Sequence, residues 1–470
     1  MNQTRVLPVF FALFFLLACL FVCSPRALSA NIPEIRVLLS SSSDQQTTVS
    51  ISAGSYTALN IHDEALGYFT AGDQVSIAYS GGKYDLRRNG ELVCEGESMI
   101  TLSADSDGSL FTFKNVKYRG DFKAISNGVT FYSTNVLDME SYLYGVVGKE
   151  IGYNLSQEAM KAQAIASRSY AIANLKPGNI YYDVTNTTSS QVYGGYSAEG
   201  QSVTQAVDGT HGQVVYYNGK TVDAVFHSNS GGHTENVENI WGSSSVPLQG
   251  VSSPYDSYAA EASSYGASTY AWTVEYTADK LVSLANTFGK KDIGDFVSIE
   301  ASTTYNGSTS VSGRALTVVI TGTKGSVTAI RDTQIRSLLQ VKSSLIEISG
   351  SQQSGGGSGA WMKDSSGKLS QAQPGGELYG VRRSGTVSPV NENNDSFFAL
   401  GKSGKKEIRK DGSAVAGDVI RINGKGYGHG VGMSQWGAIG MAVNGYSVEK
   451  IIMHYYGADG TNGVTIHTLY

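Results

Sequence analysis

The chain has 470 residues, which is more than one domain usually contains, and 41% of them are hydrophobic, so it is long enough to bury more than one core. Charged residues make up only 16% of the chain and the formal net charge is −5, which excludes the strongly basic balance of many nucleic-acid-binding proteins. The abundance of glycine and tyrosine, at 56 and 28 residues, is typical of an exported protein with β-rich parts and a surface that faces sugars or the cell wall.

The first thirty residues predict export. Arg5 supplies a positive charge, residues 6–22 form an apolar run, and residues 27–30 (Ala-Leu-Ser-Ala) form a small-residue cleavage site. We therefore expect a signal peptide over residues 1–30 and a location at the cell surface or in the cell wall. One alternative is a lipid anchor at Cys19, because residues 16–19 (Leu-Leu-Ala-Cys) partly resemble a lipoprotein cleavage site. The other is an uncleaved membrane anchor, because the apolar run is long. After cleavage Cys94 is the only cysteine, which excludes an internal disulfide and a cysteine zinc cage.

Residues 31–130 predict a small antiparallel β domain without a catalytic constellation. Residues 74–78 (Gln-Val-Ser-Ile-Ala) alternate as a half-buried strand does. Turn signals separate the runs at Gly81-Gly82, Asn89-Gly90 and Asp107-Gly108.

Helical patterns begin near Leu137. Residues 137–147 have helical spacing, and residues 148–152 (Gly-Lys-Glu-Ile-Gly) are expected to break the helix into a loop. Ser156 is the predicted N-cap of a long helix that runs to about residue 174 and is rich in alanine, which permits close helix packing. Arg168 lies among these small residues, where it is either solvated or bound to a carboxylate.

Two polar segments follow this helix. Residues 185–196 form a loop in which Gln191 and Tyr193 alternate as if lining one side of a strand. Residues 213–226 read as a β-hairpin around Asn218-Gly219 and lead into residues 227–235 (His-Ser-Asn-Ser-Gly-Gly-His-Thr-Glu). A strand that ends in polar residues and two glycines is a common way to build a site, and the alternative is an ordinary turn.

The remaining chain is interrupted by a polar segment. Residues 257–347 alternate helix and strand patterns, with a helix over 277–288 and a strand over 314–320. Residues 349–416 are rich in glycine and serine and contain short β runs, so we interpret them as an insertion. A strand over 418–422 then leads into a glycine-rich loop.

That loop, residues 426–437 (Gly-Tyr-Gly-His-Gly-Val-Gly-Met-Ser-Gln-Trp-Gly), has four glycines at every second position. Glycine lets a backbone approach another group closely, so the loop is expected to press against a ligand while Tyr427 and His429 face it. Ser434 is the predicted N-cap of a helix over 435–444, whose free N–H groups would suit a polar or anionic ligand. The alternative is a glycine-rich hairpin with surface side chains.

Together these stretches resemble the stage II sporulation protein D / LytB amidase-enhancer family, from about Leu137 to the C-terminus with residues 349–416 as a departure. The matching stretches are 137–170, 190–195, 226–234 with Trp241 and 254–256, 312–314, and 426–438.

The resemblance implies peptidoglycan glycan strands stripped of stem peptides as the substrate. It also implies cleavage between N-acetylmuramic acid and N-acetylglucosamine that leaves a 1,6-anhydro end, as by a lytic transglycosylase. Glu150 matches the position of the catalytic acid, although this chain lacks the proline that usually follows it. A lytic transglycosylase uses the sugar's own 6-hydroxyl as nucleophile, so one carboxyl group can act as acid and then as base. The family positions that match candidate sugar-binding residues are Arg168, Gln191, Ser228, Ser230, Tyr427, His429, Ser434 and Gln435.

Other functions stay open beside this one. The family also contains non-catalytic wall-binding proteins that enhance an N-acetylmuramoyl-L-alanine amidase, which makes such an amidase a candidate partner. A purely structural or adhesive surface protein is the third alternative. We expect no cofactor, because zinc at His227 and His233 would lack the cysteine ligands of the family's zinc members.

The sequence therefore predicts an α+β protein with five parts. These are a signal peptide (1–30), a β-rich N-terminal domain (31–130), a mixed α/β catalytic core in two pieces (131–348 and 417–470), and a β-rich insertion between those pieces (349–416).

Overall fold

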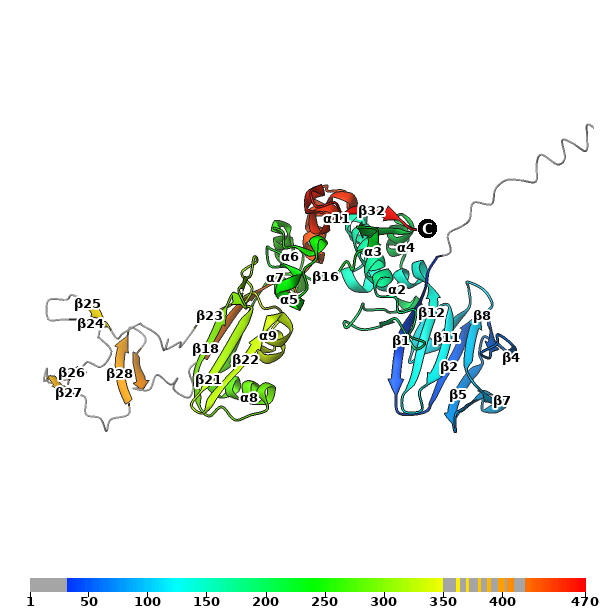
Figure 1. Cartoon of the computed structure of the whole chain (residues 1–470), viewed down its shortest axis with the longest axis horizontal. Coiled ribbons are helices and arrows are strands. Elements are labelled where there is room, and N and C mark those ends of the chain that lie inside the picture. Colours follow the sequence, from blue (N-terminus) through cyan, green and yellow to red (C-terminus); the bar gives the residue numbers. More distant parts are fainter. Residues whose placement is uncertain are drawn as a thin grey trace, which may run out of the picture.

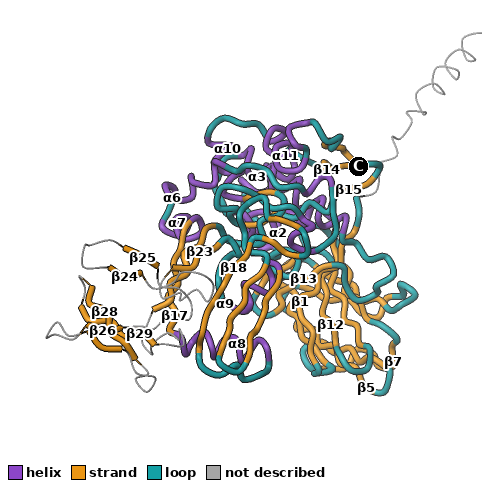
Figure 2. Tube along the Cα trace, turned by 60° about the vertical axis from the view of Figure 1, so that its left-hand side comes forward, coloured by secondary structure: helices purple, strands orange, loops and turns teal. Residues whose placement is uncertain are grey.

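The computed structural model describes residues 32–349 and 419–470 and, between them, the backbone of six short strands. A β-sheet unit and a second unit of sheets and helices both extend from the same side of a helical layer (Figures 1 and 2). The α+β fold class is confirmed. The predicted signal peptide and most of the predicted insertion lie outside the described residues.

The N-terminal unit consists of two sheets. The first has seven strands in the order β13 (Val184–Thr185), β1 (Glu34–Ser42), β12 (Phe131–Asp138), β11 (Asp121–Ser126), β8 (Ile100–Ala104), β3 (Ser55–Leu59) and β4 (Ala65–Thr70). The second has six strands in the order β10 (Val116–Tyr118), β9 (Leu110–Phe113), β2 (Gln46–Ala53), β5 (Gln74–Ser80), β6 (Lys83–Arg88) and β7 (Glu91–Glu97). All three predicted turn signals connect consecutive strands.

The two sheets pack face to face through aromatic side chains. Phe111 of β9 contacts Tyr56 of β3 and Phe122 of β11, with ring centroids 6.1 Å and 5.3 Å apart. All three rings are fully buried. Because β12 pairs with β1 and β11, the sheet continues to Asp138, beyond the domain boundary predicted at residue 130.

The helical layer is built around α3 (Gln157–Ala173). Four helices contact it: α2 (Met139–Ile151), α4 (Gln201–Asp208), α10 (Gln435–Val443) and α11 (Val448–Tyr456). Five alanines of α3 are fully buried, at positions 159, 162, 164, 166 and 171. Small side chains let all four helices approach, so the alanine-rich pattern has the packing role that the sequence predicts.

Helix α2 does not end where the sequence predicts. It continues through Gly148 to Ile151 and stops at Gly152, which has a φ of 106°. The prediction of a loop over residues 148–152 is therefore wrong. Gly148 is buried, and a Cβ there would lie 2.3 Å from the ring of Tyr153, so this glycine serves close packing inside the helix.

The second unit has its own hydrophobic core. Two three-stranded sheets contribute to it: β17 (Ala271–Thr277), β30 (Val419–Lys425) and β23 (Ile346–Ser349), and β18 (Phe296–Ser302), β21 (Thr317–Gly322) and β22 (Gly325–Ile330). Helices α8 (Ala278–Gly289) and α9 (Arg331–Leu339) pack against these strands. The stretch predicted as one core segment, 131–348, thus contributes to two separate clusters of buried side chains.

Shorter elements connect these parts. They are η2 (Tyr196–Ala198), β14 (Gln213–Tyr217), β15 (Lys220–Thr221), β16 (Phe226–His227), α5 (Val237–Trp241), η3 (Val246–Leu248), η4 (Pro254–Ser257), α6 (Tyr258–Ala262), α7 (Ser264–Tyr270), β19 (Thr304–Tyr305), β20 (Ser308–Thr309), β31 (Met433–Ser434), η5 (Ala458–Gly460) and β32 (Thr465–Thr468).

The segment predicted as an insertion contains three antiparallel strand pairs. They are β24 (Trp361–Lys363) with β25 (Leu369–Gln371), β26 (Tyr379–Val381) with β27 (Val387–Pro389), and β28 (Ser396–Gly401) with β29 (Gly404–Arg409). Across the part of the chain that the structure describes, none of the helices has the length and apolar character needed to cross a membrane.

A buried ion pair holds α2 to α3. The Nε and Nη2 atoms of Arg168 donate to the two carboxylate oxygens of Glu140 at 2.7 Å and 2.6 Å; Arg168 is fully buried and Glu140 is 4% exposed. Of the two environments that the sequence left open for Arg168, the structure has the carboxylate.

Replacing Arg168 by methionine is expected to lower the free energy of unfolding by about 3–5 kcal/mol, because it leaves the Glu140 carboxylate buried without its cation. Arg421→Met is the matched control, since Arg421 pairs with Glu275 at the surface, and such pairs contribute less than about 1 kcal/mol. Denaturant unfolding measures both. Equal, small effects would contradict the structural role of the buried pair.

Candidate functional site

Two segments that are 200 residues apart in sequence lie side by side. Strand β16 pairs in parallel with β31, so that Phe226 faces Met433 and His227 faces Ser434. Beside them, Asn229 and Tyr427 exchange backbone hydrogen bonds of 3.1 Å and 2.8 Å. The polar segment after the hairpin and the glycine-rich loop therefore form one ribbon.

The four alternating glycines are what permits this contact. All have positive φ, between 70° and 110°. A Cβ on Gly430 would lie 2.4 Å from the Cζ atom of Arg314, and one on Gly432 would lie 2.1 Å from the Val225 carbonyl oxygen. Gly430 and Gly432 thus let the loop press against the protein itself, whereas Gly428 lies in the lining of a cavity. The side chains between them, Tyr427 and His429, do face a cavity.

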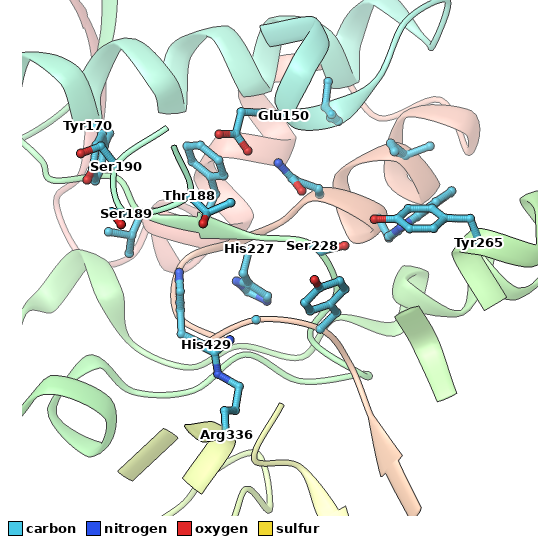
Figure 3. A pocket seen from close by; sticks show the side chains of 18 of the residues that line it. Glu150, Tyr170, Thr188, Ser189, Ser190, His227, Ser228, Tyr265, Arg336 and His429 are labelled. Carbon is cyan, nitrogen blue, oxygen red and sulfur yellow. The ribbon is translucent and has the colours of Figure 1, made fainter. Parts of the chain in front are cut away.

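That cavity, of about 600 Å³, lies between the helical layer and the second unit (Figure 3). The helical layer contributes Glu150, Ile151, Tyr170, Gln435, Trp436 and Ile439 to its lining. The loop at 188–190 lies beside Glu150. The other lining residues are Val225, Phe226, His227, Ser228, Trp241, Tyr265, Arg336, Tyr427, Gly428 and His429.

Glu150 is the only acidic residue among those that line the cavity in the described part of the chain. It stands in the last turn of α2, and its Oε1 accepts a 2.5 Å hydrogen bond from the Val192 amide. Burial raises the pKa of this carboxyl group, and hydrogen bonds from the Val192 amide and the Gln435 side chain oppose the shift only in part. A carboxyl group with a raised pKa in a cavity can donate a proton near neutral pH.

His227 lies in the cavity wall with both ring nitrogens occupied. Its Nδ1 is 3.0 Å from the Val431 carbonyl oxygen, which can only accept, so Nδ1 carries the proton. Its Nε2 then accepts from the Ser230 hydroxyl at 2.8 Å. Burial holds the pKa of His227 well below its usual value, and the neighbouring His429 and Arg314 add to the shift. This imidazole is therefore neutral and positioned by the protein.

His429 has the opposite tautomer. Its Nδ1 accepts a 3.1 Å hydrogen bond from the Val431 amide, so the neutral ring carries its proton on Nε2. Burial lowers its pKa to about 4, and the cations of Arg336 and Arg314 contribute to the shift against the opposing carboxylate of Asp332. The ring contacts that of Trp241 at a centroid distance of 4.9 Å.

Aromatic side chains with large exposed fractions line this cavity. Tyr265 is 64% exposed, Trp241 44% and Tyr427 39%. A ligand that covers these exposed rings removes their apolar surface from water, which favours binding. The flat apolar faces with a polar edge suit sugar rings. The sequence analysis did not single out Tyr265, Tyr170 or Arg336. In the sequence, the only signal for Tyr265 was its place in a stretch that contains several serines. No local pattern in the sequence of helix α9 marked Arg336.

The structure brings together five of the nine predicted site residues: Glu150, Ser228, Tyr427, His429 and Gln435. The other four have buried side chains bound to protein groups and do not line the cavity. Arg168 binds Glu140, the Gln191 amide accepts from Tyr142 at 3.0 Å, Ser230 binds His227, and the Ser434 hydroxyl donates to Asp256 at 2.5 Å. These four side chains are therefore turned into the protein, and their contacts with sugar stay predictions.

The N-terminus of α10 is also occupied by protein. The Gly437 amide donates to the Ser434 hydroxyl at 3.3 Å, which confirms Ser434 as the N-cap. The Trp436 amide donates to the Ser228 carbonyl oxygen at 3.0 Å. The expectation that this helix end offers free N–H groups to a ligand is therefore wrong for these two groups.

The two histidines considered as zinc ligands do not form a metal cluster. Within residues 32–349 and 419–470, no group of three or more His, Cys, Asp or Glu side chains is arranged to hold a metal ion. The Nδ1 of His233 lies 2.7 Å from the Thr234 carbonyl oxygen, and both nitrogens of His227 are engaged as described above.

One family model matches part of the chain. Residues 127–217 match the model described as "Stage II sporulation protein", and this segment contains Glu150, α3 and the loop at 188–190. Over this segment the chain is similar to the stage II sporulation protein D family.

Several curated relatives match a larger part of the chain. It is 31% identical over 320 residues to the amidase enhancer of Bacillus subtilis (strain 168), covering 67% of this chain and 39% of that protein. It is 27% identical over 345 residues to the stage II sporulation protein D of Bacillus amyloliquefaciens, covering 69% and 74%. An uncharacterized protein of Brachyspira hyodysenteriae is 39% identical over 143 residues, covering 30% and 39%. The chain thus spans about two fifths of the length of the first and third of these relatives.

Two glycines with similar backbone angles provide a test of the loop packing. Gly430 has a φ of 83° and contacts Arg314, whereas Gly445 has a φ of 80° and open space where a Cβ would stand. Gly445→Ala is expected to lower the free energy of unfolding by about 1–2 kcal/mol, the cost of a left-handed alanine.

Gly430→Ala also overpacks the contact with Arg314, which is expected to lower the free energy of unfolding by a further 1–3 kcal/mol, roughly. It also displaces the His429 ring, so the NMR signals of this ring change in this variant and not in Gly445→Ala. Denaturant unfolding and the NMR signals of the histidine rings provide the two readouts. Identical behaviour of the two variants would contradict the packing described here.

Proposed function

We propose that this protein is an exported, peptidoglycan-remodelling lytic transglycosylase that cleaves glycan strands between N-acetylmuramic acid and N-acetylglucosamine. The observation that carries the proposal is Glu150, the one carboxyl group among the described residues that line an aromatic cavity, with its pKa raised by burial. The match to the family model and the relatives named as sporulation proteins support a role in the cell wall.

A single carboxyl group matches this reaction better than hydrolysis. Hydrolysing glycosidases generally flank the bond with two carboxyl groups, one of which activates water or attacks the sugar. In a lytic transglycosylase the protonated Glu150 donates its proton to the glycosidic oxygen as the bond to C1 of the muramyl sugar breaks. The resulting carboxylate then accepts the proton of the 6-hydroxyl as O6 bonds to C1, which gives the 1,6-anhydro product and restores the acid.

The other residues of the cavity have supporting roles in this proposal. Neutral His429 lines the cavity beside Trp241, where its ring can pack against a sugar. Trp241, Tyr265 and Tyr427 provide faces for the sugar rings. Ser228 and Gln435 add polar groups to the lining, and the Gln435 side chain hydrogen-bonds Glu150.

A second function is favoured by a specific observation. The relative named as an amidase enhancer is 31% identical over 67% of this chain. Under this alternative the cavity binds glycan without cleaving it, and the protein acts by stimulating a cell-wall amidase. Export or anchoring through the N-terminal apolar segment is common to both functions.

Glu150→Gln keeps the shape of the acid and removes its proton. Glycan cleavage is expected to fall by roughly a hundredfold or more, the range for loss of a general acid. Binding to glycan strands is expected to survive. The melting temperature should change by no more than about a few degrees, because the side chain is not part of a packed core. Release of 1,6-anhydro ends from peptide-free strands measures cleavage.

Wild-type cleavage by this variant would show that Glu150 is not the acid. If the unsubstituted chain itself leaves the strands intact but binds them and stimulates an amidase, the enhancer function replaces the enzyme. Ser190→Ala, at another residue of the same cavity wall, is the matched control for changes in lining without loss of the carboxyl group.

The pH dependence follows from the direction of the Glu150 shift. The protonated form is needed for the first step, so cleavage falls as pH rises through the raised pKa of Glu150. Because its pKa is raised on folding, the ionised carboxylate destabilises the fold at higher pH. Glu150→Gln is therefore expected to be no less stable than the unsubstituted chain at pH 8. Initial rates and melting temperatures between pH 4 and pH 9 test both statements.

A further inference from the structure

Arg336 enters the cavity from the second unit, on the side of His429 (Figure 3). It lies on α9, and its side chain is 31% exposed. Its positive charge depresses the pKa of both His227 and His429, which places the guanidinium close to the two imidazoles. No family stretch in the sequence includes this residue.

The guanidinium is held by one nitrogen only. The Nε of Arg336 donates to the Oδ2 atom of Asp332 at 2.7 Å, and the other carboxylate oxygen of Asp332 accepts from the Ser344 amide at 3.2 Å. Asp332 itself is fully buried. In the described part of the chain, neither terminal nitrogen of Arg336 has a hydrogen-bond partner among protein groups.

Other arginines of this chain are bound differently. Arg168, Arg119 and Arg36 each engage one carboxylate through Nε and Nη2 together. Such two-point pairs occupy the edge of the guanidinium that is formed by Nε and Nη2, so these N–H groups are not available to a ligand. Asp332 thus orients Arg336 while leaving both Nη atoms available at the cavity.

The charge balance of the cavity favours an anion. Arg336 is its only permanently charged cation among the described lining residues, and the two histidines are neutral. Glu150 is the only lining acid, and its raised pKa reduces its negative charge. Lys342 adds a second positive charge near the rim, with its Nζ 5.9 Å from the ring centroid of Tyr427.

We propose that Arg336 is a specificity-determining residue that binds a carboxylate carried by a sugar of the glycan strand. This inference rests on the proposed function for the class of substrate. Among the sugars of peptidoglycan, muramic acid carries a lactyl carboxyl group, which is ionised only where no stem peptide is joined to it. The planar fork of two Nη donors matches the two oxygens of such a carboxylate. The free lactyl carboxylate of a strand without stem peptides is thus the group that Arg336 recognises.

The test compares binding of matched tetrasaccharides by isothermal titration calorimetry, in the Glu150→Gln background so that no cleavage occurs. One tetrasaccharide of alternating N-acetylglucosamine and N-acetylmuramic acid has free lactyl carboxylates, and the other has them converted to N-methylamides. Arg336→Gln is expected to weaken binding of the free carboxylate form by roughly ten- to a hundredfold, the range for charged hydrogen bonds. Its affinity for the methylamide should stay within about threefold.

Two further variants separate recognition from folding. Arg336→Lys keeps a charge beside Asp332 but loses the fork, so it should bind the free carboxylate form with intermediate affinity. Arg421→Gln removes a surface arginine from β30, away from the cavity lining, and should bind both tetrasaccharides as the unsubstituted chain does. Melting temperatures confirm that each variant is folded.

Equal weakening for both tetrasaccharides, or no weakening for either, would overturn the inference. So would an Arg336 effect seen only with a tetrasaccharide that carries stem peptides, since the carboxylate would then belong to the peptide. A chain that cleaves strands but shows no Arg336-dependent preference retains the enzyme function and loses this inference. A chain that shows the preference but does not cleave retains the inference and loses the enzyme.

Discussion

The candidate site depends on the burial of one cation, Arg314. Its guanidinium has no solvent exposure and donates to the Ser230 carbonyl oxygen at 3.0 Å and to the His233 carbonyl oxygen at 3.2 Å. Gly430 lies against its Cζ atom. Arg314 precedes β21 in the second unit, so this side chain joins that unit to both segments of the ribbon.

Burial lowers the pKa of Arg314, and the carboxylates of Asp332, Glu235 and Asp256 oppose the shift. An unpaired cation at this depth would cost several kcal/mol, so these carboxylates and the two loops are mutually required.

A second buried arginine has the same function on the other side of the cavity. Arg168 fixes α2 against α3 through Glu140, and α2 carries Glu150 less than three turns further along. The two buried arginines, one in an ion pair and the other bound to backbone carbonyl oxygens, thus help to fix the positions of the opposite walls, and the cavity lies between them. Neither arginine touches a ligand in this arrangement, although both belong to stretches that resemble the family. A buried polar residue in such a stretch can therefore be needed for the geometry of a site without being part of its surface.

The sequence predicted the bounds of the helices better than it predicted which tertiary contacts their residues make. Periodicity identified α3, α8 and α10 to within two residues, because their caps and buried faces are local features. The break predicted at Gly148 failed because glycine in a helix has two possible causes, and only the position of Tyr153 decides between them. The same ambiguity affected the alternating glycines, of which Gly430 and Gly432 approach protein. Glu150, Tyr427 and His429 were placed at the cavity by resemblance to a family. Tyr265 and Arg336 come from helices whose relation to the cavity depends on tertiary packing, so no local pattern identified them.

Under the proposed mechanism, the two walls contribute different kinds of group. The helical layer supplies a carboxyl group whose pKa is raised because it is removed from water, and this wall holds no compensating lysine or arginine. The second unit supplies Arg336, held by Asp332 on the far side of the two neutral imidazoles. Had the arginine been adjacent to Glu150, it would have lowered the pKa of the acid and removed its proton at neutral pH. Placing the anion-binding group and the proton donor on separate units lets one cavity bind a negatively charged strand while the pKa of its acid stays raised, and it makes the activity dependent on the contacts through which Arg314 holds the units together.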